Sequence, residues 1–270
     1  MKDNPIFTPG PDGGCPGERL LVVCDFDGTV CRVDMGNAFL ERFAEGWEEI
    51  DRSYSAGEVG SRVAYSRIAP LFRANRSQVL DFVLRRERLD PFFPEFLSFC
   101  RGRKIDLKIV SDGLDVYIEA ILQKHGLDVE FFSNRLVFQG NGRIDFAFPW
   151  VSEECGRCGT CKRSLLDRFR PSYDRIIYVG DGYSDVCPAR AADQVFAKPI
   201  LYEKCVKNGT PCLRYDDFGD IRRCLEKKLV INHFDDEVLK VFDVQGRHLL
   251  LPRYGASRTR IIQTSKLQSG

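Results

Sequence analysis

The chain has 270 residues, long enough to bury a core, and suits one large domain or one domain with an insertion. Its 40 basic and 39 acidic side chains leave a formal net charge of +1, without the basic excess expected of a dedicated nucleic-acid binder. No stretch approaches the roughly 18 consecutive apolar residues that a membrane helix needs. We therefore expect a cytoplasmic protein that has neither nucleic acid nor a membrane as a partner.

The 11 cysteines are an odd number, and no secretory segment leads the chain. This combination favours reduced thiols over a disulfide framework. Residues 1–19 are rich in proline and glycine and are expected to form a flexible leader.

Three short apolar runs, at residues 20–24, 107–110 and 175–179, predict buried strands. Helical patterns follow the second and third runs, at residues 116–124 and 184–192. Strands that alternate with helices are typical of a parallel sheet covered on both faces. We therefore predict an α/β fold, a three-layer Rossmann-like parallel sheet, in which ligands bind beyond the carboxyl ends of the strands.

About eighty residues separate the first two strands, far more than the dozen or so of a single crossover helix. Apolar spacings of three and four predict helices over residues 37–50, 58–72 and 77–86, the last with Ser77 as its N-cap. We expect residues 33–89 to form a helical cap. The core domain would then comprise residues 20–32 and 90–229, including a helix over 95–101.

Residues 135–138 and 144–148 flank the turn Gln139-Gly140-Asn141-Gly142, which predicts a β-hairpin before a helix over residues 163–169. Residues 230–270 leave the alternating plan. They are expected to form a C-terminal appendage that contains a second hairpin, between residues 238–244 and 248–251.

Polar side chains follow each of the three strands, where a parallel sheet brings the strand ends together. The set comprises Asp25, Asp27, Ser111, Asp181 and Asp185, with Lys162 at the start of a nearby helix. Carboxylates and phosphate are the ligands that Mg²⁺ prefers, while an ammonium and a hydroxyl can bind phosphate oxygens. One carboxylate of the first pair could attack phosphorus to form an aspartyl-phosphate, and the other could move the proton. The set therefore predicts phosphoryl transfer.

These motifs, in this order, resemble the haloacid dehalogenase (HAD) superfamily of phosphatases over residues 20–223. Asp25-Phe26-Asp27-Gly28-Thr29 looks like its first motif, Ser111 its second, Lys162 its third, and Gly180-Asp181-Gly182-Tyr183-Ser184-Asp185 its fourth. The resemblance implies that Asp25 is the nucleophile and Asp27 the general acid and base. It further implies phosphate binding by Gly28, Thr29, Ser111, Asp112 and Lys162, magnesium binding by Asp25, Asp181 and the carbonyl of Asp27, and support from Gly182 and Asp185.

The cap and the sequence ahead of the first hairpin resemble the phosphoserine phosphatase branch. The run from Cys155 to Lys162 is similar to a loop of the methionine-salvage enol-phosphate phosphatases and of the phosphoethanolamine/phosphocholine phosphatases. The implied activity is magnesium-dependent hydrolysis of a small-molecule phosphoric monoester (EC 3.1.3.-). The candidate substrates, in order, are 2-hydroxy-3-keto-5-methylthiopentenyl-1-phosphate, phosphoethanolamine or phosphocholine, and phosphoserine. A phosphotransferase and a catalytically silent binding or regulatory protein are the rival functions.

Two further groups have alternative interpretations, and the oligomeric state is left open. Trp47, Tyr54, Tyr65 and Phe72 form either a cage for a quaternary ammonium or, as we favour, the hydrophobic seam of the cap. Arginines of the cap (52, 62, 67 and 73) would suit a second anionic group of a substrate, and Glu41 or Glu45 an ammonium. Cys155, Cys158 and Cys161 could hold a structural Zn²⁺ with Cys187, Cys205 or Cys212, or form a loop of reduced thiols whose oxidation inhibits, which we favour.

Overall fold

The computed structural model describes residues 18–231, 240–242 and 248–250, which fall into two compact units, residues 1–234 and 235–270. The described part of the first unit contains a seven-stranded sheet in the order β4-β3-β2-β1-β5-β6-β7. Every neighbouring pair is parallel except β3 and β4. The strands are β1 (Leu20–Cys24), β2 (Asp106–Leu114), β3 (Glu130–Gln139), β4 (Arg143–Ala147), β5 (Arg175–Gly180), β6 (Gln194–Ala197) and β7 (Leu213–Arg214).

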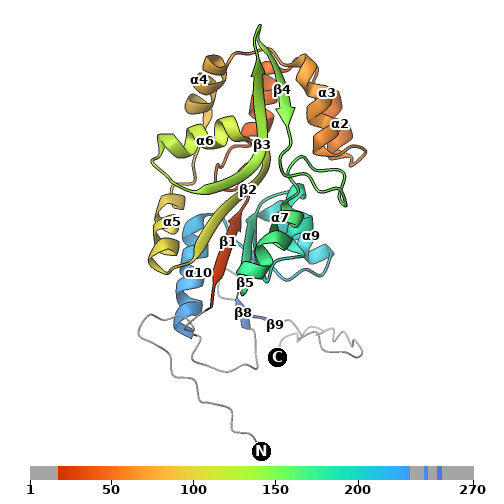
Figure 1. The fold of residues 1–270 in the computed structure, drawn as a ribbon. Coiled ribbons are helices and arrows are strands. Elements are labelled where there is room, and N and C mark those ends of the chain that lie inside the picture. The colour runs from red at the N-terminus through yellow and green to blue at the C-terminus, as the bar shows by residue number, and fades with distance from the viewer. Residues whose placement is uncertain (1–17, 232–239, 243–247, 251–270) are drawn as a thin grey trace, which may run out of the picture. The chain divides into compact units, whose positions relative to one another are not determined.

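The central strand β1 explains why both faces of the sheet are covered. Its side chains alternate, so that Val22 and Cys24 join one buried cluster while Leu21 and Val23 join another. The first cluster is completed by helices α5 (Phe93–Gly102), α6 (Asp115–Lys124) and α10 (Phe218–Ile231), and the second by α7 (Lys162–Phe169), α8 (Val186–Ala189) and α9 (Pro199–Lys207). The ribbon shows these helices in separate layers on either side of the sheet (Figure 1). This confirms the predicted three-layer α/β fold.

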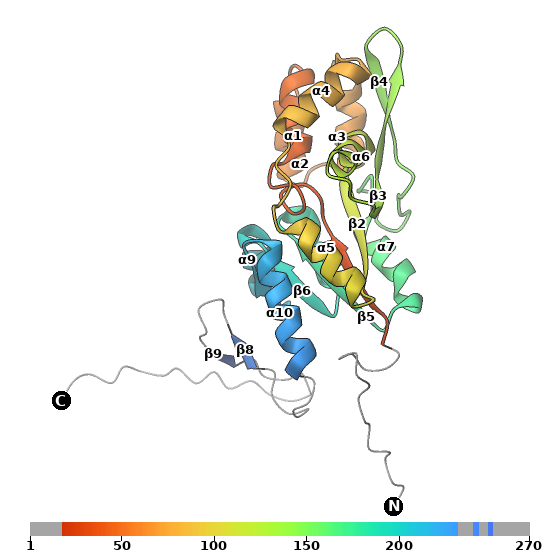
Figure 2. The same cartoon turned by 90° about the vertical axis from the view of Figure 1, so that its left-hand side faces the viewer.

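Four helices lie beyond the carboxyl end of β1, where the insertion was expected (Figure 2). They are α1 (Met35–Phe43), α2 (Glu48–Ser55), α3 (Ser61–Ile68) and α4 (Arg76–Arg86), with a 3₁₀ turn at Ala69–Leu71. The single helix expected over residues 37–50 is wrong, because the chain turns between α1 and α2 and Gly46 there has a φ of +83°. Asn75, not Ser77, caps α4, because it exchanges hydrogen bonds with Gln78 in a capping box.

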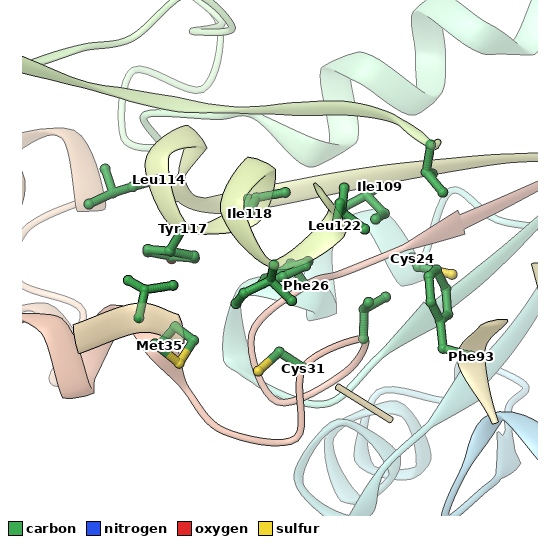
Figure 3. Packing of buried hydrophobic residues seen from close by; sticks show 14 of the residues in the cluster. Cys24, Phe26, Cys31, Met35, Phe93, Ile109, Leu114, Tyr117, Ile118 and Leu122 are labelled. Carbon is green, nitrogen blue, oxygen red and sulfur yellow. The ribbon is translucent and has the colours of Figure 1, made fainter. Parts of the chain in front are cut away.

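The aromatic core connects this cap to the sheet. Tyr117 and Ile118 extend from α6 toward Phe26, which follows β1, and toward Met35 at the start of α1 (Figure 3). All four side chains are fully buried, and each contributes on the order of 1.5–3 kcal/mol on burial. The first turn of the cap is therefore fixed directly on the end of the central strand.

Three elements differ in extent from the prediction. β2 continues through Ser111 to Leu114, with an irregular register after Val110. β3 spans ten residues, so that it pairs in parallel with β2 before it forms the predicted hairpin with β4. The helix expected over 184–192 is only a 3₁₀ turn and the short α8, since Pro188 has no N–H with which to continue the ladder.

The C-terminal unit is described only at β8 (Lys240–Phe242) and β9 (His248–Leu250), which pair antiparallel as the predicted second hairpin requires. The rest of that hairpin and most of the predicted leader lie outside the described residues. None of the described helices combines the length and apolar character needed to cross a membrane.

Glu87, at the end of α4, anchors the cap to α6. Its carboxylate lies 2.7 Å from Lys124 Nζ and 3.0 Å from His125 Nε2, and it accepts the Leu89 N–H at 2.9 Å. Burial opposes its ionisation, but these partners outweigh burial and lower the pKa of Glu87 to about 2.

We predict that Glu87→Gln removes a pH-dependent share of the stability, on the order of 2 kcal/mol at neutral pH. The contribution is present above the ordinary pKa of glutamate, near 4.5, and disappears as pH falls through about 2. Urea unfolding of both proteins between pH 7 and 2.5 measures it. The control Asp81→Asn breaks only the exposed pair with Arg85 and is expected to change stability by less than about 0.5 kcal/mol at every pH. A Glu87→Gln difference that stays constant with pH would contradict this assignment.

Candidate active site

The sheet brings the predicted polar residues together because β1 pairs in parallel with both β2 and β5. A pocket of about 140 Å³ lies between this edge of the sheet and the cap. Its sheet side is lined by Asp25, Asp27, Ser111, Asp112, Gly113, Lys162 and Ser184. A larger hollow, of about 300 Å³, lies beside Asp106 at the opposite end of β2 and contains none of the predicted groups. We therefore take the smaller pocket as the candidate active site, because it contains the predicted polar side chains.

Lys162 occupies the centre of the site. Its Nζ lies 2.7 Å from Asp25 Oδ1 and 2.7 Å from Asp185 Oδ1, and it donates to Ser184 Oγ at 3.1 Å. Burial by itself would lower the pKa of Lys162, but the charges of Asp185 and Asp25 raise it above its usual range. The ammonium is therefore held charged in the interior.

Asp185 is committed to structure on both of its oxygens. Oδ1 accepts from the Tyr178 hydroxyl at 2.6 Å in addition to Lys162, and Oδ2 accepts the N–H groups of Asp181 and Gly182 at 2.9 and 3.0 Å. Burial opposes ionisation, yet Lys162 and these donors lower the pKa of Asp185. Asp185 and the N–H of Gly182 therefore shape the loop after β5, and their supporting role in catalysis stays a prediction.

Asp25 accepts the Phe26 N–H at 2.7 Å and the Lys162 ammonium on the same oxygen, Oδ1. Oδ2 is thus the oxygen left to meet a ligand. Burial, reinforced by the negative charge of Asp185, raises the pKa of Asp25 well above its ordinary value.

Asp27 is held by different partners. Its Oδ1 accepts the Met35 N–H at 2.8 Å, and its Oδ2 accepts the Tyr117 hydroxyl at 2.6 Å. Burial and the nearby charge of Asp34 raise the pKa of Asp27 to about 7. A carboxyl group with that pKa can both donate and accept a proton near neutral pH. The backbone of Gly113 lies close to this pair: a Cβ on Gly113 would lie 1.9 Å from the Tyr117 hydroxyl and 2.5 Å from Asp27 Oδ2.

Asp181 is packed against the first loop. A Cβ on Gly28, whose φ is +72°, would lie 2.3 Å from Asp181 Oδ2, and Thr29 Oγ1 donates to Asp181 Oδ1 at 3.3 Å. Lys198 donates to the Gly28 carbonyl at 2.5 Å. Burial and the charge of Asp185 raise the pKa of Asp181 to about 6. Gly28 and Thr29, expected at the phosphate, thus contact Asp181 and do not line the pocket.

Within the described residues, Asp25, Asp181 and Asp185 form the one group of carboxylate, histidine or cysteine side chains that suits a metal, with one ligand atom from each within 4.8 Å of the others. An all-oxygen donor set suits a hard divalent cation such as Mg²⁺. Asp25 and Asp181 were expected in this set. Asp185 joins it in space, but its hydrogen bonds already occupy both oxygens.

Asp112 lines the pocket, and its polar groups are engaged in several hydrogen bonds. Its Oδ1 accepts the Thr160 N–H at 2.9 Å and the Asn134 side-chain amide at 3.0 Å, and its carbonyl accepts the Tyr65 hydroxyl at 3.1 Å. The side chain of Asp112 therefore joins the cap, β3 and the cysteine loop, while Asp112 still lines the pocket and its phosphate-binding role stays a prediction. Ser111 Oγ accepts the Gly113 N–H at 3.0 Å, and its hydroxyl stays at the pocket.

The cap supplies pocket residues that the sequence pattern did not reveal. Asp34, Asn37, Leu40, Asp51, Ala64 and Ile68 line this side together with Tyr54 and Tyr65. Phe72 is fully buried and stacks on Phe39 at 4.7 Å, and Trp47 packs against the core cluster, so the hydrophobic-seam interpretation is correct for both. Glu41 and Glu45 are exposed, and no arginine of the cap lines the pocket.

Within the described residues the thiols of Cys155, Cys158 and Cys161 lie near one another without forming a compact group of three, and the possible zinc site stays a prediction. Cys155 and Cys158 have their sulfurs 3.7 Å apart, but the three thiols of the loop do not all lie within 4.8 Å of one another. Cys205 contacts Cys212 instead, and Cys187 is exposed.

Comparisons with known proteins agree on one kind of protein. Residues 20–199 match a family model described as Putative Phosphatase. A 2-hydroxy-3-keto-5-methylthiopentenyl-1-phosphate phosphatase of Brevibacillus brevis is 30% identical over 78% of this chain and 96% of its own length, and the enzyme of that name from Geobacillus kaustophilus is 30% identical over 79% and 99%.

Similar solved structures include a phospho-aspartyl intermediate analogue of phosphoserine phosphatase, with a TM-score of 0.60 and 21% identity over 78% of this chain and 99% of that one. A substrate-bound phosphoserine phosphatase has a TM-score of 0.61 and 20% identity over 77% and 98%. At these identities the likeness shows the fold, which is that of the haloacid dehalogenase phosphatases.

We predict that mutations of the two aspartates in the loop after β5 have different effects, one on Mg²⁺ binding and the other on stability. Asp181→Asn removes a cation ligand and is expected to weaken Mg²⁺ binding at least about tenfold with little loss of stability. Asp185→Asn leaves Lys162 short of a buried counter-charge and is expected to cost about 3 kcal/mol of stability. Calorimetric titration with Mg²⁺ and urea unfolding measure the two effects. The assignment fails if Asp185→Asn weakens Mg²⁺ binding as an intact, equally stable protein while Asp181→Asn binds normally.

Proposed function

This chain belongs to the Putative Phosphatase family and is a hydrolase of phosphoric monoesters with the haloacid dehalogenase fold, and on that premise we propose that it hydrolyses 2-hydroxy-3-keto-5-methylthiopentenyl-1-phosphate through an aspartyl-phosphate on Asp25. The observation that carries the mechanism is the Asp25–Lys162 contact of 2.7 Å beside Asp27, whose pKa is about 7. The activity for which the relatives are named and the lining of the cap pocket support this substrate.

In the first step Asp25 Oδ2 attacks phosphorus and the bond from phosphorus to the ester oxygen breaks. Asp27 gives its proton to the departing oxygen, which a group with a pKa near 7 does efficiently. In the second step Asp27 takes a proton from water, which attacks the aspartyl-phosphate and releases phosphate and Asp25. Tyr117 and the Met35 N–H hold the Asp27 carboxyl in place for both transfers.

Phosphate binding falls to Lys162, the Ser111 hydroxyl and backbone N–H groups at this edge of the sheet. Asp25, Asp181 and the carbonyl of Asp27 would hold Mg²⁺, which when bound neutralises phosphate charge. Lys162 would oppose the same phosphate charge, and its contacts with Asp185 and Ser184 keep it from moving. Gly28 lets Asp181 approach the first loop closely enough to share the cation with Asp25.

The cap pocket suits the substrate named for the relatives. Leu40, Ala64 and Ile68 provide an apolar end for a methylthio group, while Asn37 and the tyrosines can bind a hydroxyl and a ketone. Phosphoserine fits less well, because its carboxylate would need a cation and the one cation that lines the pocket, Lys162, is already paired.

One observation favours a second candidate. Asp34 and Asp51 both line the pocket and would attract the ammonium of phosphoethanolamine or phosphocholine. Asp34 already accepts the backbone N–H of Asn37 at 2.8 Å and its side-chain amide at 2.9 Å, so Asp51 is the carboxylate that distinguishes the two substrates.

Initial rates with the four phosphate esters test the proposal. We expect kcat/KM for the methylthiopentenyl ester to exceed the others at least about tenfold, and Asp51→Asn to alter it less than about twofold. Asp25→Asn is expected to lose about 10³-fold or more in kcat for every ester, and chelation of Mg²⁺ to abolish turnover. A preference for an ammonium ester that Asp51→Asn removes would establish the second candidate. Undiminished activity of Asp25→Asn would contradict the aspartyl-phosphate mechanism, whereas transfer to an added alcohol in place of hydrolysis would make the protein a phosphotransferase.

Gly113→Ala provides a test of the Asp27 geometry. The added Cβ forces apart Tyr117 and Asp27, and we expect kcat for p-nitrophenyl phosphate to fall about 10- to 100-fold. Gly102→Ala is the matched control, because a Cβ there meets nothing within 4 Å. Thermal unfolding of both variants verifies that they are folded, and equal kcat values in folded variants would show that the close approach does not matter.

A further inference from the structure

The loop of residues 155–161 holds the cap at the turn between α2 and α3. Arg157 Nη2 donates to the carbonyls of Gly57 at 2.7 Å and Val59 at 3.3 Å, and the Arg157 carbonyl accepts the Arg62 N–H at 3.2 Å. Further along the loop, the Gly159 N–H donates to Ser61 Oγ at 3.0 Å. These contacts join segments about one hundred residues apart in the chain, so the loop acts as a clasp on the cap.

The clasp is tightly fitted. A Cβ on Gly60 would lie 2.1 Å from the carbonyl oxygen of Arg157 and 2.6 Å from its carbon, distances at which one backbone must shift. A displacement of Arg157 therefore also changes the contact with Gly60, because the two backbones are already closely packed.

The same loop ends at the catalytic edge of the sheet. Thr160 donates through its N–H to Asp112 Oδ1 and through its hydroxyl to Asn134 Oδ1. Cys161 then precedes Lys162, which is the first residue of α7. The seven-residue loop 155–161 thus connects the turn between α2 and α3 with Lys162, whose ammonium lies beside Asp25.

Cys155 and Cys158 enclose Arg157 in this loop. Their sulfurs are 3.7 Å apart and both side chains are half-buried, so that small molecules can reach them. Burial would raise the pKa of Cys155, but hydrogen bonds from the backbone of Arg157 and Cys158 and from the thiols of Cys158 and Cys161 lower it. Burial and the charge of Asp112 raise the pKa of Cys158. One sulfur is thus the better nucleophile, and its neighbour keeps its proton.

We propose that Cys155 and Cys158 are a modification site at which a peroxide or disulfide oxidant forms an intraloop disulfide that releases the cap from Arg157. The two sulfurs must approach from 3.7 Å to about 2.05 Å, and the residues between them, Gly156 and Arg157, must move with them. The inference goes beyond the proposed function, since it concerns control of the cap whatever the ester.

With hydrogen peroxide the reaction balances as follows. The Cys155 thiolate attacks one oxygen, the O–O bond breaks, and Cys155 becomes a sulfenic acid while the other oxygen leaves as water after taking a proton. The Cys158 sulfur then attacks the Cys155 sulfur, gives up its proton, and expels the hydroxyl as a second water. Two thiols are oxidised by two electrons, and one peroxide is reduced to two waters.

The test oxidises the full chain with stoichiometric peroxide and maps disulfides by peptide mass. We expect a loss of two hydrogens confined to the peptide that contains Cys155 and Cys158, faster hydrogen exchange over residues 57–65, and a fall of at least about fivefold in kcat/KM for p-nitrophenyl phosphate that dithiothreitol reverses. Cys155→Ser and Cys158→Ala should each keep the activity of the reduced protein and resist the oxidant. Cys187→Ser, which alters an exposed cysteine outside the loop, should respond as the unmodified chain does.

Arg157→Ala in the reduced protein tests the clasp without the oxidation. We expect it to speed hydrogen exchange over residues 57–65 in the absence of any oxidant. Disulfide mapping and hydrogen exchange need no substrate, so they report on the clasp even if the proposed substrate is wrong. Pairing of Cys155 with Cys161, stoichiometric zinc in the purified protein, or a Cys155–Cys158 bond that leaves exchange over residues 57–65 unchanged would each overturn the proposal.

Discussion

The buried ammonium of Lys162 is the interaction on which the site depends. It lies between Asp25 and Asp185, and a charge in that position must be paired because transfer out of water costs several kcal/mol. One ammonium does not balance the three carboxylates of Asp25, Asp181 and Asp185, and burial of the surplus raises the pKa values of Asp25 and Asp181. The site therefore has an excess of acidic groups, which suits a divalent cation and, with that cation bound, a phosphate.

Close backbone approaches make this density of charge possible. Glycine at position 28 admits Asp181, and glycine at position 113 admits the Asp27–Tyr117 pair. Asp185 uses its two oxygens to order the loop that carries Asp181, so that one carboxylate positions another. The division of labour among four aspartates thus follows from their hydrogen-bond partners, since the side chains themselves are identical.

The strand ends and their order in the chain were enough to predict the fold and the set of Asp25, Asp27, Ser111, Lys162 and Asp181, because parallel pairing converts a recurring local pattern into proximity. Tyr117 and Tyr178 were not found, since each reaches the site from an element whose own sequence shows only ordinary helix or strand residues. Lys198 was not found either, since it lies between β6 and α9, where no local pattern indicates its contact with Gly28. The same limit applies to Asp51, which becomes a pocket residue only when α2 folds over the sheet. Gly46 and Asn75 did carry local signals, a turn and a capping box, that apolar spacing outweighed.

The residues that act on phosphate and the residues that meet the rest of the substrate lie in different segments of the chain, but the structure brings them together. The sheet edge supplies the groups that act on any phosphate ester, which is consistent with a fold shared at about 20% identity, while the cap supplies the side chains that meet the rest of the substrate. Asp112 connects the two, because its carbonyl binds Tyr65 of the cap and its carboxylate binds the loop that leads to Lys162. The cap pocket and the lysine that contacts Asp25 are therefore connected by one network of hydrogen bonds, so the position of the cap and that of the ammonium depend on each other.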